Sequence, residues 1–165
     1  MSARSKALVI GGSFGGLFAA NLLLRAGWDV EVFERVNEAL ADRGAGIVTH
    51  DELFAAIRRA GATVDDTMGC ATRSRVTLDR AGAVVAEMPL EQILTAWGRL
   101  YRLLKDVFPA QHYHYRRAFE RVEQDADGVT AYFADGSSSR GDLLIGADGI
   151  RSTVRACLAP RAAPQ

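Results

Sequence analysis

The sequence predicts an α/β fold, and three observations carry that expectation. A branched apolar run at Lys6–Ile10, typical of a buried parallel strand, leads into a glycine-rich turn. A helical pattern over Gly15–Ala26 and a second apolar run at Asp29–Phe33 then complete a βαβ unit. Farther along, Phe119–Gln124 and Val129–Phe133 flank a turn and begin an antiparallel meander. We therefore expect a Rossmann-like βαβ sheet followed by a three-stranded antiparallel meander.

The remaining segments alternate turn residues with short periodic patterns. In chain order they predict a glycine-bearing loop at Asp42–Val48, a helix at Asp51–Ala60, a hairpin of Arg75–Leu78 and Val84–Met88 closed at Asp79–Gly82, an amphipathic helix at Leu94–Phe108, a strand at Asp142–Ile145 and a short helix beginning near Ser152. The chain after the meander is thus expected to return to the α/β pattern with which it began.

The composition excludes several classes of function. A length of 165 residues with 48% apolar and 24% charged side chains is typical of a soluble globular domain. Lys+Arg and Asp+Glu balance at 20 each, so the net charge favours neither nucleic acid nor a membrane surface as a partner. Cys70 and Cys157 have no CxxC partner, which argues against a disulfide framework or a metal site and favours a cytoplasmic protein. We see neither an apolar run of about 18–20 residues nor an export signal.

The segment Gly11–Gly16, with the sequence GGSFGG, lies between the first predicted strand and its helix. Glycines at such a turn let backbone N–H groups approach a pyrophosphate, and the helix dipole favours its negative charge. We expect Gly11 to make the tight turn and Gly16 to allow close helix–strand packing, while Ser13 replaces the usual middle glycine. Glu34 ends the second strand, where a carboxylate accepts ribose hydroxyls. A glycine turn in an unrelated α/β protein would not account for Glu34, but the motif does not separate NAD from FAD.

A second motif near the other end of the chain narrows the choice. The segment Gly141–Arg155 contains GADGIRSTVR after an apolar strand, and it resembles the Asp-Gly motif of single-component flavoprotein aromatic hydroxylases, the para-hydroxybenzoate hydroxylase group. The likeness is greatest to the 2,6-dihydroxypyridine hydroxylase-like monooxygenases of that group. It covers residues 4–159, with shared stretches at Gly11–Leu17, Val32–Arg35, Gly44–Val48 and Trp97–Leu104.

This resemblance implies an FAD site, with no catalytic acid–base residue and no metal ligand in the chain. The implied cofactor-binding residues are Gly11, Ser13, Phe14, Gly15, Gly16, Glu34, Arg35, Arg43, Gly46, Ile47, Trp97, Asp148 and Gly149. Three alternatives stay open: Arg43 as a solvated loop arginine, Trp97 with Tyr101 as core aromatics, and Asp148 within a turn that caps a helix at Ser152. The pairs Arg58–Arg59 and Arg116–Arg117 are interpreted as solvated surface.

The resemblance also implies the reaction and the extent of the chain. NADH or NADPH would reduce FAD, and O₂ would then be used to hydroxylate a small aromatic substrate, either a phenol or a hydroxylated N-heterocycle. Residues 1–165 are expected to form an incomplete FAD-binding domain, the N-terminal half of such an enzyme, with residues 73–90 an orphaned hairpin of the substrate domain. A homodimer or a completing C-terminal half is the expected protein partner.

Two other functions stay open from the sequence. The first is a truncated, non-catalytic FAD- or nucleotide-binding module that needs a partner chain. The second is an NAD-linked dehydrogenase, against which Asp148-Gly149 and the meander argue.

Overall fold

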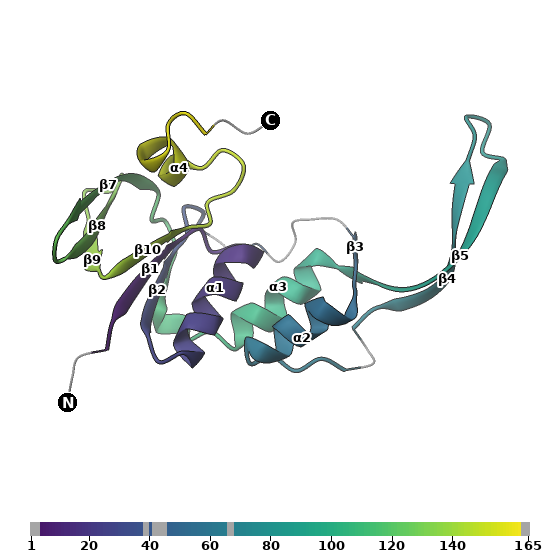
Figure 1. The fold of residues 1–165 in the computed structure, drawn as a ribbon, viewed down its shortest axis with the longest axis horizontal. Helices are drawn as coiled ribbons and strands as arrows, with labels where there is room; N and C mark the ends of the chain where they lie inside the picture. The colour runs from purple at the N-terminus through teal and green to yellow at the C-terminus, as the bar shows by residue number, and fades with distance from the viewer. Residues whose placement is uncertain (1–3, 38–39, 41–45, 66–67, 163–165) are drawn as a thin grey trace.

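A computed structural model describes residues 4–37, 40, 46–65 and 68–162. Its centre is a parallel sheet of four strands in the order β10-β1-β2-β6, drawn at the left of Figure 1. The strands are β1 (Lys6–Ile10), β2 (Asp29–Phe33), β6 (Tyr113–His114) and β10 (Leu143–Gly146). The observed β1 and β2 have the predicted bounds, and β10 is displaced by one residue from the predicted Asp142–Ile145 strand.

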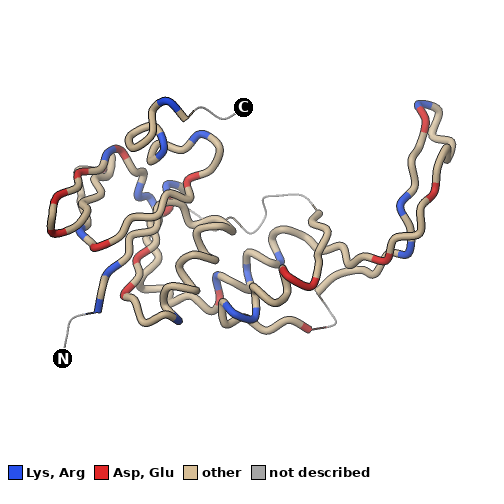
Figure 2. The backbone as a smooth tube through the Cα atoms, in the orientation of Figure 1, with Lys and Arg blue, Asp and Glu red and all other residues tan. Residues whose placement is uncertain are grey.

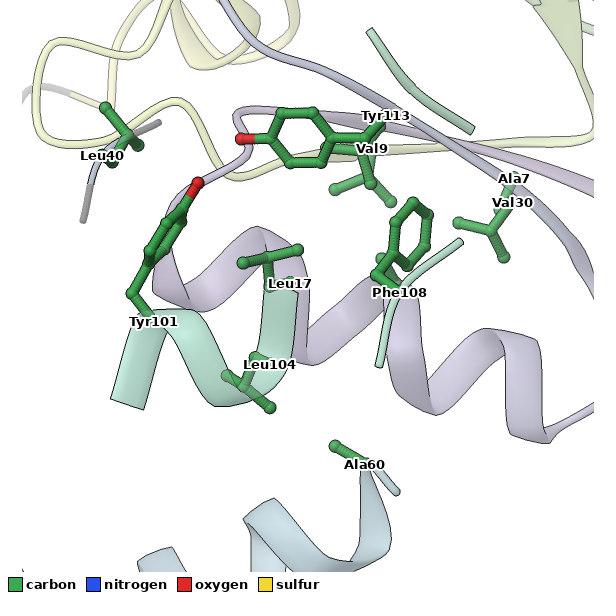
Figure 3. Close-up of a cluster of buried hydrophobic side chains, with 12 residues drawn as sticks. Ala7, Val9, Leu17, Val30, Leu40, Ala60, Tyr101, Leu104, Phe108 and Tyr113 are labelled. Carbon is green, nitrogen blue, oxygen red and sulfur yellow. The ribbon is translucent and has the colours of Figure 1, made fainter. Parts of the chain in front are cut away.

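Both faces of β1 are buried, which explains its unbroken apolar sequence. Ala7 and Val9 face α1 (Phe14–Arg25) and belong to the cluster shown in Figure 3, whereas Leu8 and Ile10 belong to a second cluster under the meander. Alternate side chains along a strand point to opposite faces, so this division follows from the strand geometry. The helix α1 matches the predicted helix within one residue at each end.

The sheet is covered by the meander on one face and by helices on the other. The predicted meander is confirmed as β7 (Phe119–Asp125), β8 (Gly128–Phe133) and β9 (Ser138–Gly141), followed after β10 by α4 (Thr153–Leu158). Its Ala131 and Phe133 pack on Leu8 and Phe33. On the opposite face, α1 lies beside α3 (Trp97–Asp106).

The predicted hairpin is correct in position but too short. It consists of β4 (Cys70–Leu78) and β5 (Val84–Ala96), and Figure 1 shows it as an arm projecting away from the parallel sheet. Register shifts between Thr72 and Ser74 and between Thr77 and Leu78 interrupt the alternation of side chains, which hides the full strand length from a period-2 pattern. Basic and acidic residues are interspersed along the arm, as they are on the meander (Figure 2).

Two expectations at the base of this arm are wrong. The expected loop at Asp42–Val48 ends in a strand, β3 (Gly46–Val48), and the expected helix from Leu94 begins only at Trp97. The reason is one pairing: Leu94–Ala96 forms the antiparallel partner of β3, which completes a sheet of order β3-β5-β4. Residues 41–45 of the predicted loop lie outside the described part of the chain.

The helix α2 (Asp51–Arg59) confirms the predicted helix at Asp51–Ala60 and covers a third hydrophobic cluster. Its Ile57 and Phe54 pack against Leu100 of α3 and against Met68. A 3₁₀ turn, Ala110–His112, then leads from α3 into β6, a strand that the sequence did not predict. Both residues of β6 pair in parallel with β2, so it adds the outermost strand next to the glycine loop.

Candidate functional site

A cleft of about 740 Å³ opens at the carboxyl ends of β1, β2 and β10. In open α/β sheets this edge is where ligands bind. Most of the predicted cofactor-binding residues line the cleft: Gly11, Ser13, Gly15, Glu34, Arg35, Trp97, Asp148 and Gly149. The structure therefore brings together the two glycine-containing motifs that stand at opposite ends of the sequence.

The other predicted residues take different places. Phe14 begins α1 and packs edge-to-face on Phe18, with ring centroids 4.8 Å apart. Gly46 and Ile47 lie in β3 and pair with Ala96 and Thr95, the two residues that precede Trp97. Arg43 lies outside the described residues.

Close packing explains two of the glycines in the first motif. Gly11 has φ +102°, and a Cβ there would lie 2.4 Å from the carbonyl oxygen of Ala147. A Cβ on Gly16 would lie 1.8 Å from the carbonyl oxygen of Gly11, so Gly16 permits the predicted close approach of helix and strand. Gly15 differs, because a Cβ there meets no described atom within 4 Å. Its backbone faces open space in the cleft.

The amino end of α1 points into this cleft and carries no acidic residue in its first turn. Ser13 occupies the N-cap position, yet its side chain makes no capping hydrogen bond within the described residues. The first N–H groups of a helix lack intrahelical acceptors, and their dipoles attract anions. This end of α1 thus offers free backbone donors and a free hydroxyl to a phosphate.

Glu34, which we expected to accept ribose hydroxyls, is 6% exposed and is bonded to the backbone. Its Oε2 accepts a hydrogen bond from Gly12 N at 2.8 Å, and its Oε1 accepts one from Val36 N at 3.1 Å. A carboxylate has about four acceptor positions, so these two bonds leave capacity for ribose hydroxyls. The side chain both lines the cleft and holds the glycine loop to the end of β2.

In the second motif Asp148, like Glu34, both lines the cleft and holds the adjoining backbone through hydrogen bonds. Its Oδ1 accepts from Ser152 Oγ at 2.5 Å, and its Oδ2 accepts from Thr153 N at 2.6 Å. Ser152 Oγ in turn accepts from Arg155 N at 2.9 Å, which makes Ser152 the N-cap of α4. The capping turn that we left open as an alternative is present, and Asp148 lines the cleft as well.

The two aromatic residues of α3 divide between core and site. Trp97 stacks on Tyr101 with ring centroids 5.2 Å apart and an interplanar angle of 10°. Tyr101 is 1% exposed, whereas Trp97 is half-buried and lines the cleft. Tyr101 is accordingly a core aromatic, whereas Trp97 packs on the core with one face and also lines the cleft.

Arg117 is a cleft residue that we had interpreted as solvated surface. Its backbone N–H donates to Glu34 O at 2.9 Å, and its guanidinium pairs with Asp135 in the turn before β9. The sequence signal that could have placed Arg117 at the cleft is its position in the connection between the short strand β6 and the meander, because that connection passes over the sheet edge. Because β6 itself escaped prediction, this position could not be inferred.

The described residues contain no cluster of three or more His, Cys, Asp or Glu side chains suited to a metal. Among them, no helix is both long and apolar enough to cross a membrane.

Comparison with known families decides what the cleft belongs to. Residues 4–163 match the FAD binding domain family. The chain belongs to this family. The match covers both glycine motifs and the segment between them, in agreement with their meeting at one cleft in the structure.

Similar proteins include several flavin hydroxylases. The chain is 33% identical to 2,6-dihydroxypyridine 3-monooxygenase of Paenarthrobacter nicotinovorans over 89% of its own length and 37% of the relative's. It is 34% identical to FAD-dependent urate hydroxylase of Klebsiella pneumoniae, over 91% of the chain and 42% of that protein. The solved structure of 2,6-dihydroxypyridine-3-hydroxylase from Arthrobacter nicotinovorans superposes with a TM-score of 0.84 at 32% identity, over 94% of this chain and 40% of that one. The chain thus spans about two fifths of the length of the relatives it matches.

Proposed function

We propose that this chain is the dinucleotide-holding part of an FAD-dependent, NAD(P)H-using monooxygenase that hydroxylates a phenol or a hydroxylated N-heteroaromatic ring. The observation that carries the proposal is the single cleft into which both the amino end of α1 and the Asp148–Gly149 turn project. Family membership and the flavin hydroxylases among the similar proteins support the same assignment.

The donor set of the cleft fits FAD. The free N–H groups of the first turn of α1 and the Ser13 hydroxyl suit a pyrophosphate, and Gly15 leaves room for its approach. Glu34 and Arg35 at the end of β2 would hold the adenosine part, while Asp148 and Gly149 would hold the ribityl side. Trp97 would contribute an apolar wall beside them.

The reaction chemistry belongs to the cofactor. When bound, FAD supplies a two-electron acceptor for NAD(P)H and the means of activating O₂ toward an electron-rich ring. The chain's own residues bind and orient it and keep water from one side of the cleft. We assign no acid–base residue to the reaction within this chain.

The hairpin arm is proposed to belong to a substrate domain that covers the flavin end of the cleft. An isolated two-stranded ribbon has marginal stability in water. This one exposes Val76, Leu78, Val84, Val85 and Met88, each about half exposed or more. Exposed apolar side chains of this kind support a covering partner, namely a completing C-terminal half or a second copy of the chain.

A second candidate is a non-catalytic FAD-binding module that acts only with a partner chain. The uncovered apolar arm favours it, because the substrate side of the site is unpartnered in a single copy. We place the protein in the cytoplasm under either proposal, since Cys70 and Cys157 are both exposed and free, as is usual in a reducing compartment.

The decisive experiment is a titration of the purified chain with FAD, followed by flavin fluorescence, against Arg35→Ala and a matched control, Arg58→Ala. Arg35 is an exposed cation on the cleft wall, and Arg58 is an exposed cation on α2. We expect saturable binding that weakens about fivefold in R35A, the effect of one exposed charge on a phosphate-bearing ligand, and stays unchanged in R58A. Absence of FAD binding, or tighter binding of NAD⁺ than of FAD, would overturn the proposal. Aromatic-stimulated NAD(P)H oxidation by the chain alone would eliminate the second candidate.

A further inference from the structure

Gly12 is turned away from the cleft that its neighbours line. Gly11 and Ser13 lie on the cleft wall, whereas a Cβ on Gly12 would lie 2.0 Å from the hydroxyl oxygen of Tyr113 on β6. The backbone N–H and C=O of Gly12 both form hydrogen bonds on this side, away from the cleft. Its N–H donates to Glu34 Oε2 at 2.8 Å, and its carbonyl accepts a buried hydrogen bond from Tyr113 Oη at 2.9 Å.

These two bonds fix two consecutive peptide planes. In a trans peptide the C=O of one residue and the N–H of the next point in opposite directions within one rigid plane. The Glu34 bond therefore orients the Gly11–Gly12 peptide, whose carbonyl is directed toward Gly16. The Tyr113 bond orients the Gly12–Ser13 peptide, so that Ser13 N–H points away from the tyrosine and toward the cleft side.

Ser13 N–H is a free donor in this arrangement. None of the described residues accepts a hydrogen bond from it, while the carbonyl of the same residue accepts from Leu17 N at 2.9 Å. A free N–H at the amino end of a helix is a binding group for an anion. The direction of this donor depends on a hydroxyl 101 residues away from Gly12 in the sequence.

The Tyr113 side chain is packed on several sides, and Figure 3 shows its hydroxyl oxygen beside the turn that joins β1 to α1. Tyr115 lies 4.7 Å from its ring centroid, Phe108 packs edge-on at 6.4 Å, and the Lys105 ammonium lies 4.2 Å from the centroid. Burial raises the pKa of the Tyr113 hydroxyl far above its ordinary value. The group consequently remains protonated, and a hydrogen-bond donor, at neutral pH.

We propose that Tyr113 is a positioning residue for pyrophosphate binding: its hydroxyl orients the Gly12–Ser13 peptide so that Ser13 N–H faces the anion. This inference rests on the proposed function, since the anion in question is the pyrophosphate of FAD. It assigns a role in cofactor affinity to a residue that does not line the cleft and lies on a strand of two residues.

The test compares Tyr113→Phe with Tyr132→Phe in the 165-residue chain. Both substitutions remove one hydrogen-bonded hydroxyl and keep the ring, but Tyr132 Oη donates to Glu123 Oε2 at 2.7 Å on the meander and takes no part in the glycine loop. FAD dissociation constants are measured by fluorescence at a temperature where thermal unfolding curves show both variants to be folded. We expect Y113F to bind FAD about five- to tenfold more weakly, the effect of one buried hydrogen bond, and Y132F to stay within about twofold of wild type.

A second readout requires no FAD. Amide exchange followed by NMR in the free chain should show faster exchange of Gly12 N–H in Y113F than in wild type, because Gly12 loses one of the two hydrogen bonds that hold it and the adjoining peptide becomes freer to open. Should Y113F unfold, the wild-type Tyr113 hydroxyl proton serves instead, and a buried, bonded hydroxyl gives a resonance that exchanges slowly with water.

The outcomes separate the two proposals. If wild type binds FAD and Y113F binds it equally well, the inference is overturned and the proposed function stands. If wild type fails to bind FAD, the proposed function is overturned, and the pyrophosphate role with it. Unchanged Gly12 exchange in Y113F, or a fast-exchanging Tyr113 hydroxyl in wild type, overturns the positioning of the loop whether or not FAD binds.

Discussion

The two glycine loops at the cleft are held in contrasting ways. Gly12 in the first loop is bonded to Glu34 and Tyr113, which are 22 and 101 residues distant in the sequence. Among the described residues, Asp148 in the second loop accepts from Ser152, Thr153 and Val154 alone, all within six residues of it. The Gly12 turn is therefore held by side chains from other strands. The Asp148 side chain acts within its own local sequence, although Ala147 N–H just before it joins the second loop to Ile10 O of β1 at 2.7 Å.

This difference determines how far a perturbation travels. A change at Gly12 or its anchors should affect the sheet as a whole, because the anchors belong to β2 and β6. A change at Asp148 should be confined to the start of α4. The following substitutions test that contrast, in order of decreasing effect.

Glu34→Ala is expected to cost the most. It leaves the N–H groups of Gly12 and Val36 without their carboxylate acceptor, and two such losses amount to about 3–4 kcal/mol in the free energy of unfolding. Urea denaturation measures it. The matched control is Glu120→Ala, an exposed acidic residue of β7, which should stay within about 0.5 kcal/mol of wild type. A loss confined to FAD affinity, with normal stability, would show that Glu34 does not anchor the loop.

Gly12→Ala should destabilise the fold by about 2–3 kcal/mol, because its Cβ would overlap the hydroxyl and ring of Tyr113. Gly15→Ala is the matched control. Its Cβ meets no described atom within 4 Å, and alanine favours a helix, so the folding free energy should be unchanged or improved by about 0.5–1 kcal/mol. FAD binding should nevertheless weaken in G15A, since the new methyl occupies the cleft wall. Equal destabilisation by both substitutions would contradict the distinct orientations of the two glycines.

Asp148→Ala should cost about 1–2 kcal/mol, because Asp148 accepts from the first N–H groups of α4 beside its N-cap Ser152, and the effect should be local and similar in size to the loss of an N-cap. Amide exchange is expected to accelerate in α4 and to stay unchanged in α1. Asp127→Ala, at an exposed turn between β7 and β8, provides the control and should leave exchange in both helices unaltered. Faster exchange at Gly12 in D148A would show that the Asp148 side chain acts beyond its own turn.

Glu31→Gln should give the smallest effect and involve neither loop. Burial raises the pKa of Glu31, but the Lys6 ammonium at 2.9 Å and the Ser139 hydroxyl outweigh it, so the pKa lies below the ordinary value of 4.5. A lowered pKa stabilises the fold above the unfolded-state pKa, and this contribution is lost as the pH falls through the folded-state pKa. E31Q should be less stable than wild type by under about 1 kcal/mol at pH 7. Thermal unfolding should show the difference shrinking below about pH 4.5, and a difference that grows in acid would reverse the sign.

Much of the fold could be predicted because its signals are local. The continuous apolar runs of β1 and β2 have the expected bounds, and the turn residues placed the meander correctly. What escaped prediction depends on a distant partner. Leu94–Ala96 has helical spacing but becomes strand because Gly46–Val48 lies beside it, and β6 has only two residues because β2 supplies its partner.

The candidate site shows the same division. The glycine pattern, Glu34 and Asp148 were recognisable from sequence order, and all of them line or hold the cleft. Arg117 was missed, since its position follows from β6 and the start of the meander. The backbone bonds of Glu34 were also unforeseen, because a carboxylate at the end of β2 gives no sign of which partner it will take.

The long sequence separation between β1 and its partner strand β10 has a consequence for folding during synthesis. Lys6 N–H donates to Asp142 Oδ2 across 136 residues, where β10 joins β1, and β6 completes the other side of the sheet only after the hairpin arm has been made. Contacts so distant in sequence form slowly, because a long loop must close before they stabilise anything. On the ribosome, β1 and β2 therefore emerge well before the strands that flank them. Until then the unpaired backbone edges of these two apolar strands remain open to pairing with other chains. A chaperone that covers the nascent βαβ unit would therefore raise the yield of folded protein.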